Sequence, residues 1–158
     1  MSTSKLKVYE SKRNFTKSGE PKAIVKSPSK GNIYSIQEHH ASSHLHWDLR
    51  LEHEGILLSW AIPKSPDVLK EKGTKRLAIQ TEDHPLDYAF FQGEIKEGYG
   101  KGTVKLWDKG TYLTKAMDKK KIEININGKK LNGNYVLIKS NYGKSEEQRK
   151  KSWLFFKV

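Results

Sequence analysis

An eight-residue segment between Leu45 and Glu52 alternates apolar and polar side chains without a break. Successive side chains of a β-strand point to opposite faces, so the segment predicts a strand with one core face and one polar face. The core face is predicted to carry Leu45, Trp47, Leu49 and Leu51. The polar face is predicted to carry His46, Asp48, Arg50 and Glu52. Because residues two apart on one face lie about 7 Å from each other, one metal ion can reach both His46 and Asp48, with Arg50 one step further along.

The histidines around this strand extend the set of candidate metal ligands. Five of the six histidines lie between His39 and His53, and the adjacent pair His39 and His40 precedes the strand at a distance suited to a further ligand. His44 shares the predicted face of His46 and is another candidate. A cation on two imidazoles and one carboxylate keeps open positions for water and a substrate oxygen, and a neighbouring guanidinium can take a second phosphate oxygen. The pattern therefore favours metal-assisted chemistry on a phosphate over a merely solvated polar face.

A second cluster of chemically useful side chains runs from Arg76 to Tyr88. Its alternation predicts a strand with two apolar residues inward, Leu77 and Ile79. The outward residues are predicted to be Arg76, Ala78, Gln80 and Glu82. His84 follows the strand, where it can donate a hydrogen bond or a proton to a phosphate, and Tyr88 adds a neutral donor.

The rest of the chain also has the two-residue period of strands, broken by Gly, Asn, Asp and Pro. The predicted strands are 32–37, 45–52, 56–62, 75–81, 103–107, 121–127, 135–139 and 153–158. Hairpin turns are expected at 53–55 and 127–129, one helical turn at 66–70, and no buried helix at 145–151. About eight short strands predict an all-β protein, a single small antiparallel barrel in residues 31–158. Residues 1–30 are predicted to form a basic, partly ordered, extended arm anchored by Phe15, Ile24 and Val25.

Composition restricts the partners of the chain. Lys and Arg number 30 against 18 acidic residues in 158, a formal charge of +12 with a pI near 9.7, which favours nucleic acid as the partner; a solvated, thermally robust surface is the alternative. The absence of cysteine excludes disulfides and thiolate ligands. No long apolar run or signal segment is present, so we expect a soluble protein of the cytoplasm with no membrane contact.

Several longer motifs resemble one known family, the 3′-phosphoesterase domain of DNA ligase D, in order from about residue 13 to residue 158. The motifs are Gln37-Glu38-His39-His40-Ala41, Leu45 to Glu52, Ser59-Trp60-Ala61-Ile62-Pro63-Lys64, Glu82 to Tyr88, Phe91 to Ile95, Gly100 to Val104 and Trp107 to Thr111. The resemblance implies a small β-barrel enzyme of DNA repair by non-homologous end joining. It further implies a manganese-dependent activity, with Co²⁺ or Zn²⁺ as alternatives, that removes a 3′-terminal ribonucleoside and then the 3′-phosphate.

The resemblance also implies roles for individual residues. His46 and Asp48 match two metal ligands. The residues that match groups around the scissile phosphate are Arg13, Glu20, Arg50, Lys64, His84 and Tyr88. Gln37, Arg76 and Glu82 match supporting positions, with Arg76 on phosphate and Glu82 taking part in catalysis. The implied substrates are duplex or primer–template 3′ ends, and the implied partners are a separate ligase, polymerase or end-binding repair protein at the nucleoid.

The sequence departs from the family pattern at three places. The usual spacing selects His40 as third ligand, whereas alignment of Ala41 selects His39 and places an extra serine after it; we favour His40 and keep His39 and His44 as alternatives. Asn14 stands where the family carries Asp, which puts that supporting role in doubt. The loop at 97–100 is one residue short, and no ligase or polymerase module accompanies the domain, so we expect a freestanding protein.

Two rival functions follow from the same residues. An iron oxygenase would use His46, Asp48 and His84 as ligands, although a small organic substrate gives no reason for the charge of +12. A non-catalytic nucleic-acid module of the OB type would stack bases on Trp47, Trp60 or Tyr99, although the alternation sends both tryptophans to the core.

Overall fold

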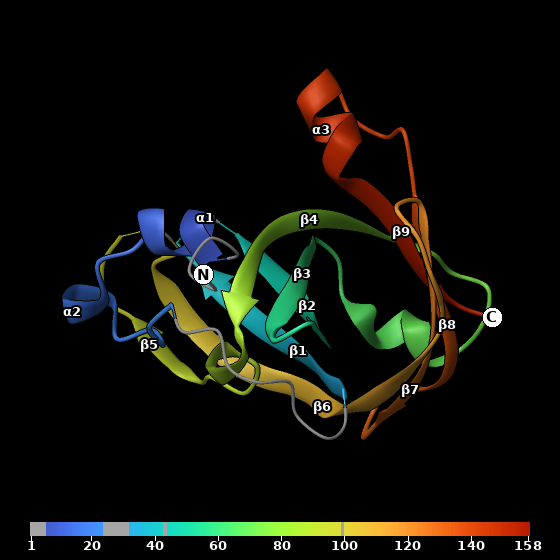
Figure 1. The fold of residues 1–158 in the computed structure, drawn as a ribbon, viewed down its shortest axis with the longest axis horizontal. Helices are drawn as coiled ribbons and strands as arrows, with labels where there is room; N and C mark the ends of the chain where they lie inside the picture. The colour runs from blue at the N-terminus through green and yellow to red at the C-terminus, as the bar shows by residue number, and fades with distance from the viewer. Residues whose placement is uncertain (1–5, 24–31, 43, 99) are drawn as a thin grey trace.

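The computed structural model describes residues 6–23, 32–42, 44–98 and 100–158. Within these residues the chain forms mainly antiparallel strands, joined or flanked by short helices and 3₁₀ turns (Figure 1). The strands are β1 (Asn32–Ala41), β2 (Leu45–His53), β3 (Ile56–Ile62), β4 (Arg76–Pro85), β5 (Gly93–Ile95), β6 (Gly102–Met117), β7 (Lys121–Gly128), β8 (Asn132–Lys139) and β9 (Ser152–Lys157). The helical elements are α1 (Lys7–Ser11), α2 (Phe15–Ser18), α3 (Glu146–Lys151) and the 3₁₀ turns η2 (Pro66–Lys70) and η3 (Leu86–Tyr88).

Eight of these strands close into a barrel. They follow the order β1-β2-β3-β4-β9-β8-β7-β6, and pairing of β1 with β6 closes the ring, while β5 lies outside on the free side of β6. The predicted all-β barrel is therefore confirmed, and β3 has the predicted bounds. Strand β6 is much longer than the predicted 103–107 because its first part pairs with β1 and its second part with β7. The three-residue β5 was not predicted.

One apolar core fills the barrel and receives side chains from all eight of its strands. Its largest fully buried members are aromatic: Tyr34, Trp60, Tyr112, Tyr135 and Phe155. Trp47, Leu49 and Leu51 of β2 join this core as predicted, whereas Leu45 is 38% exposed. The prediction for Leu45 was wrong because it is the first residue of β2, where the strand runs past the core.

A second apolar cluster lies on the opposite side of β3 and attaches the N-terminal segment. Leu6 and Tyr9 are fully buried there against Leu57 and Tyr88, with Phe15 packed at the edge. Two helices shorter than seven residues form in this segment. Ile24 and Val25, the other predicted anchors, lie outside the described residues. Among the described helices, none has both the length and the apolar character needed to span a bilayer.

The faces of β4 differ from the prediction. Ala78 is fully buried in the barrel core and pairs with Trp153, whereas Leu77 and Ile79 line surface hollows. The small Ala78 fits where the large Trp153 ring already fills the core, so the more apolar residues of the strand take the other face. The prediction that Leu77 and Ile79 point inward was therefore wrong.

A bulge in β4 then changes which residues face the same side. Ser59 of β3 pairs with Thr81, but Leu57 pairs with His84, so two steps along β3 match three along β4. An extra residue in one strand shifts the side-chain alternation. His84 consequently faces the same side as Thr81 and Ile79 and lies within β4, one residue before its end.

Candidate active site

A pocket of about 540 Å³ lies on the side of β2 that faces away from the barrel core. The N-terminal segment, strands β1 to β4, and the turns after β5 supply its walls. The polar residues of β2 that face it are His46, Asp48 and Arg50, as their spacing predicts. Glu52, the fourth polar residue of the strand, is buried farther along and accepts a hydrogen bond from the Ile33 amide at 2.9 Å.

One group in the pocket has the composition of a metal site. The ligand atoms of His39, His46 and Asp48 all lie within 4.8 Å of one another. Asp48 Oδ2 lies 3.6 Å from His39 Nδ1, and Oδ1 lies 3.3 Å from His46 Nε2. Two imidazoles and one carboxylate suit a divalent transition metal and leave coordination positions open.

The side chains around this group prepare its atoms for a cation. His39 Nε2 lies 2.6 Å from the Gly100 carbonyl oxygen, so Nε2 carries the hydrogen and Nδ1 presents a lone pair toward Asp48. Nδ1 of His46 is buried and has no hydrogen-bond partner among the described residues. A bound cation would give the His39 Nδ1 lone pair a partner beside Asp48, so the residues present fit a metal.

Charge in the pocket keeps Asp48 ionised. Burial alone would raise its pKa, but the Arg50 charge and hydrogen bonds from His39 and His46 together hold the pKa well below the usual range. For His39, burial lowers the pKa most strongly, yet the contacts that the protonated ring makes with Asp48 and the Gly100 carbonyl together outweigh burial, and the net pKa is raised. The carboxylate is therefore ionised at neutral pH.

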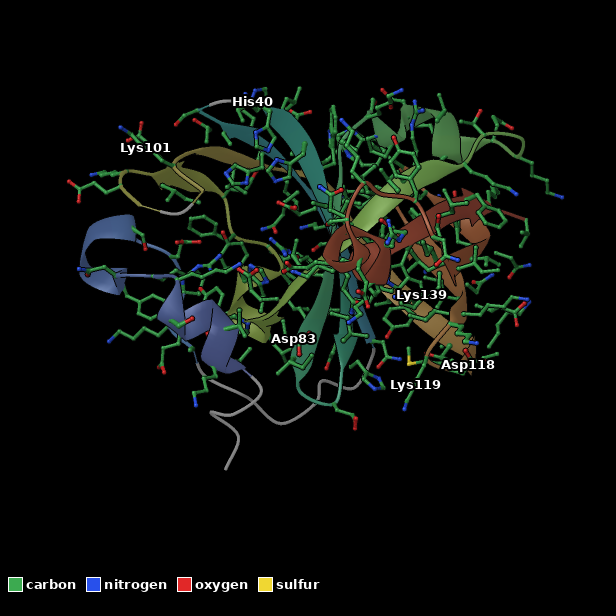
Figure 2. The ribbon with its side chains drawn as sticks, turned by 90° about the horizontal axis from the view of Figure 1, so that it is seen from above. His40, Asp83, Lys101, Asp118, Lys119 and Lys139 are labelled. Carbon is green, nitrogen blue, oxygen red and sulfur yellow. The ribbon has the colours of Figure 1, made fainter. Side chains whose placement is uncertain are left out.

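The register of β1 against β2 determines which histidine lies beside His46 and Asp48. His39 on β1 pairs directly with His46 on β2, whereas His40 pairs with Leu45. Directly paired residues share one face of a sheet. His40 instead lies at the edge of the molecule (Figure 2), and its Nε2 is 2.7 Å from Glu38 Oε2. The structure thus places His39, the alternative, in the group and leaves out the favoured His40.

His44 borders the group without joining it. Its ring lies 5.0 Å from that of His46, and the residue lines the pocket. The Ala41 amide donates to the His44 carbonyl at 3.0 Å, so the ends of β1 and β2 meet beside the group. The two histidines that the structure brings together, His39 and His46, are seven residues apart in the sequence.

Arg50 lies beside the metal group and is held from several sides. Its Nε donates to Gln37 Oε1 at 2.9 Å, and Nη2 lies 3.7 Å from Asp48 Oδ2. The guanidinium also lies 5.0 Å from the centre of the Tyr88 ring. Gln37 in turn donates to the carbonyl oxygens of Tyr88 and Phe91. Gln37 therefore fixes the direction of Arg50, in keeping with a supporting position.

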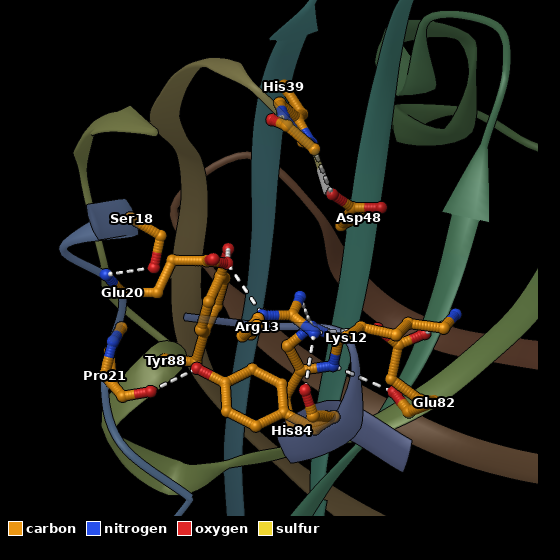
Figure 3. Close-up of polar contacts among 12 residues, drawn as sticks. Lys12, Arg13, Ser18, Glu20, Pro21, His39, Asp48, Glu82, His84 and Tyr88 are labelled. Carbon is orange, nitrogen blue, oxygen red and sulfur yellow. Dashed lines mark hydrogen bonds and ion pairs between the residues drawn. The ribbon is translucent and has the colours of Figure 1, made fainter. Parts of the chain in front are cut away.

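Arg13 brings a second guanidinium into the pocket from the N-terminal segment. It bonds Glu20 at 3.0 Å and Glu82 at 3.1 Å, and all three side chains are almost fully buried (Figure 3). The Tyr9 ring lies 4.0 Å from the guanidinium carbon. Tyr88 donates its hydroxyl to Glu20 at 2.8 Å. A network of two carboxylates and one guanidinium thus joins the segment to β4.

His84 lies between the two guanidinium groups. Arg13 Nη2 is 3.3 Å from Nε2, Arg50 Nη1 is 3.2 Å from Nδ1, and the Glu82 carbonyl oxygen is 2.8 Å from Nδ1. Burial, and then the charges of Arg50 and Arg13, hold the pKa of His84 well below its usual value. The ring is therefore neutral at pH 7. The shortest contact assigns the hydrogen to Nδ1, leaving the Nε2 lone pair toward Arg13.

Three predicted residues lie away from this pocket. Lys64 and Arg76 line a second hollow, and Arg76 Nε donates to the Ser65 carbonyl at 2.9 Å. Asn14 is exposed at the start of α2, where its carbonyl accepts from the Ser18 amide.

Some residues that contact the pocket's side chains were not singled out as site residues from the sequence. Tyr9 packs under Arg13, the Ser59 hydroxyl is 3.3 Å from His84 Nδ1, and the Gly100 carbonyl holds His39. A tyrosine four residues before an arginine and a serine within a strand are common patterns, so neither carried a usable signal. Gly100 did carry some signal, because a glycine often marks a position with positive φ, and its φ is +78°.

Comparison with known proteins gives a consistent match. The model of the DNA ligase D 3′-phosphoesterase domain matches residues 37–139. The multifunctional non-homologous end joining DNA repair protein LigD of Mycobacterium tuberculosis is 43% identical over 140 residues, covering 84% of this chain and 18% of the relative. LigD of Pseudomonas aeruginosa is 40% identical over 157 residues, covering 93% and 18%. The chain thus spans less than a fifth of the length of these relatives.

Proposed function

The chain belongs to the DNA ligase D 3′-phosphoesterase domain family, and from this membership we propose that it is a metal-dependent phosphoesterase acting on 3′ ends of DNA. The finer proposal is an end-healing reaction in two steps. Removal of a 3′-terminal ribonucleoside leaves a 3′-phosphate, and removal of that phosphate leaves a 3′-OH for synthesis or ligation. The proposed cofactor is Mn²⁺, with Co²⁺ and Zn²⁺ as alternatives.

The observation that carries the proposal is the sharing of one pocket by a His-His-Asp group and two guanidinium groups. His39, His46 and Asp48 would hold the cation, and Arg50 lies 3.7 Å from the same carboxylate. Bound there, a divalent cation would polarise a non-bridging phosphate oxygen and lower the pKa of a coordinated water. With one oxygen on the cation, a phosphodiester at this position keeps one further non-bridging oxygen for a guanidinium donor, and a terminal 3′-phosphate keeps two.

The two arginines would stabilise the charge that develops on the phosphate as the ester bond breaks. Gln37 and Tyr88 hold Arg50, while Glu20 and Glu82 hold Arg13, so neither guanidinium must reorganise during the reaction. Neutral His84 would keep the two cations apart, with its Nε2 lone pair accepting from Arg13 Nη2. The proposed role of the N-terminal segment is therefore to deliver Arg13 and Glu20.

The rival functions receive less support. Trp47 is 8% exposed and Trp60 is fully buried, so neither ring is free to stack on a base; Tyr99 lies outside the described residues. The set proposed for the iron oxygenase, His46, Asp48 and His84, is not the one brought together, because His39 and not His84 completes the group.

The charge of the chain supports DNA as the substrate. With a formal charge of +12, the surface would hold a duplex or primer–template through its phosphates and would not read sequence. We further propose that the protein works in the cytoplasm at the nucleoid, in non-homologous end joining beside a DNA ligase, a polymerase or an end-binding protein.

The test is processing of a 5′-labelled primer–template whose primer ends in one ribonucleotide, with Mn²⁺, without metal and with chelator. Wild-type protein is expected to shorten the primer by one nucleoside and then remove the phosphate, only with metal. His46→Ala and Asp48→Ala are expected to abolish both steps. His53→Ala is the matched control, because His53 lies at the far end of β2 and pairs with Glu54. Near-normal turnover by either of the first two variants would refute the proposal.

A further inference from the structure

A second hollow, of about 430 Å³, adjoins the active-site pocket. The two hollows share Pro63, the residue that follows β3. The rest of the lining of the second hollow comes from Lys64, from the start of β4 and the residue before it, from Leu154 of β9, and from Ser140 and Tyr142, which follow β8. A polymer chain that leaves the first pocket over Pro63 therefore enters the second hollow.

The charged side chains that line this hollow are cationic. They are Lys64, Lys75 and Arg76, and no acidic residue is among the described residues of its lining. The bond from Arg76 Nε to the Ser65 carbonyl fixes the guanidinium without using its terminal nitrogens. The Lys75 ammonium lies 4.7 Å over the Phe156 ring. Two cations held in place in one concave surface favour a phosphate ligand.

An exposed aromatic ring borders the same surface. Tyr142 is 66% exposed, although its backbone is held on both sides. Its amide donates to Ser140 Oγ at 3.1 Å, and Ser152 Oγ donates to its carbonyl at 2.6 Å. An accessible aromatic ring on a fixed backbone, next to cations, is the combination that stacks on bases of single-stranded nucleic acid.

We propose that the second hollow binds a nucleotide on the 5′ side of the one that bears the scissile phosphate, with Lys75 and Arg76 on its backbone phosphate and Tyr142 stacked on its base. This inference rests on the proposed function, since it concerns the same strand. At a 3′ end, at most one nucleoside lies beyond the scissile phosphate. The part of the strand long enough to pass Pro63 is therefore its 5′ side. Lys64 and Arg76 accordingly hold the strand and not the scissile phosphate.

The test compares two single-stranded substrates that end in one 3′-ribonucleotide and carry either one or eight deoxynucleotides. Tyr142→Ala is expected to raise KM for the longer substrate at least about fivefold, the lower end of the range for base stacking, with little change in kcat. The shorter substrate does not reach the hollow, so its kinetics should not change. Tyr142→Phe keeps the ring and should behave as wild type. Equal effects of Tyr142→Ala on both substrates, or none on either, would overturn the proposal.

Binding measured without turnover separates this inference from the proposed function. A labelled eight-deoxynucleotide strand is titrated in chelator at several salt concentrations. Lys75→Ala is expected to reduce the slope of log affinity against log salt by about 0.7, one phosphate contact on a single strand. Lys129→Ala is the charge-matched control, because Lys129 lies in the turn before β8, at the opposite end of that strand from Ser140. An unchanged slope for Lys75→Ala refutes the subsite, whereas normal binding with no end processing refutes only the proposed function.

Discussion

The Gly100 carbonyl oxygen lies 2.6 Å from His39 Nε2 and thereby decides which nitrogen of that ring faces Asp48. With the hydrogen on Nε2, the Nδ1 lone pair is left for a metal, 3.6 Å from Asp48 Oδ2. A hydrogen-bond partner on the second ring nitrogen sets the tautomer and orientation of a histidine that binds a metal. The segment after β5 therefore contributes to the candidate metal site through its backbone.

Gly100→Ala is expected to weaken Mn²⁺ binding about 10- to 100-fold, the usual cost of disturbing such a partner. A Cβ at Gly100 would meet His39 Cε1 at 3.2 Å, and the φ of +78° disfavours any side chain. Gly98→Ala is the matched control, because Gly98 has a similar φ of +84° but no atom within 4 Å of an added Cβ. Metal titration calorimetry measures both. Equal losses in the two variants would assign the effect to backbone strain and not to His39.

Removal of each of the adjacent histidines distinguishes the two candidates for the third ligand. His39→Ala should lower Mn²⁺ affinity by more than the roughly 10- to 100-fold of an outer partner, because it deletes a donor atom from the group. His40→Ala should leave the affinity within about twofold of wild type, since its ring lies at the surface beside Glu38. The reverse order of effects would restore His40 as the ligand.

The barrel was predictable because its signal is local. Alternation in strands such as Ile56–Ile62 follows from burial on one face, and β2 obeys it from His46 onward. That His46, Asp48 and Arg50 lie on one face of β2 could be predicted from the two-residue period alone. The same rule failed in β4, where the size of Trp153 sent Ala78 inward and a bulge changed the face of His84. Both causes lie in a neighbouring strand, so β4 alone does not encode them.

The third histidine depended on a similar non-local fact. Spacing along the chain favoured His40, but the register of β1 against β2 places His39 opposite His46. The helices of the N-terminal segment also escaped prediction, because α1 buries little more than Tyr9 and shows no helical stripe. The roles assigned to individual residues, and the boundary between arm and barrel near residue 30, stay predictions.

Arg13→Ala should detach the N-terminal segment from the barrel. Loss of the guanidinium leaves Glu20 and Glu82 buried without their shared partner, which costs about 3–5 kcal/mol in comparable buried networks. Lys12→Ala is the control, because Lys12 pairs with the same Glu82 but its side chain is 37% exposed, and such pairs contribute about 1 kcal/mol or less. Limited proteolysis of residues 6–23 measures the opening. Equal protection of the two variants would contradict a joining role for Arg13.

Acid should destabilise the protein through His84. Its pKa in the folded protein lies well below the 6.5 of an unperturbed histidine, chiefly because of burial and then of Arg50 and Arg13. As the pH falls below about 6.5, the unfolded chain binds a proton that the folded protein refuses, so the stability present above this pH is progressively lost toward the folded pKa. The slope from one such group is at most about 1.4 kcal/mol per pH unit. Groups whose pKa is raised in the folded protein, such as His39, give stability the opposite dependence on pH. The informative quantity is therefore the difference in stability loss between wild type and His84→Asn, a variant whose amide can still donate to the Glu82 carbonyl. The free energy of unfolding, measured with urea in chelator at pH 7.5 and 5.5, should fall less in the variant than in wild type. Equal losses in the two proteins would mean that His84 is already charged in the folded state.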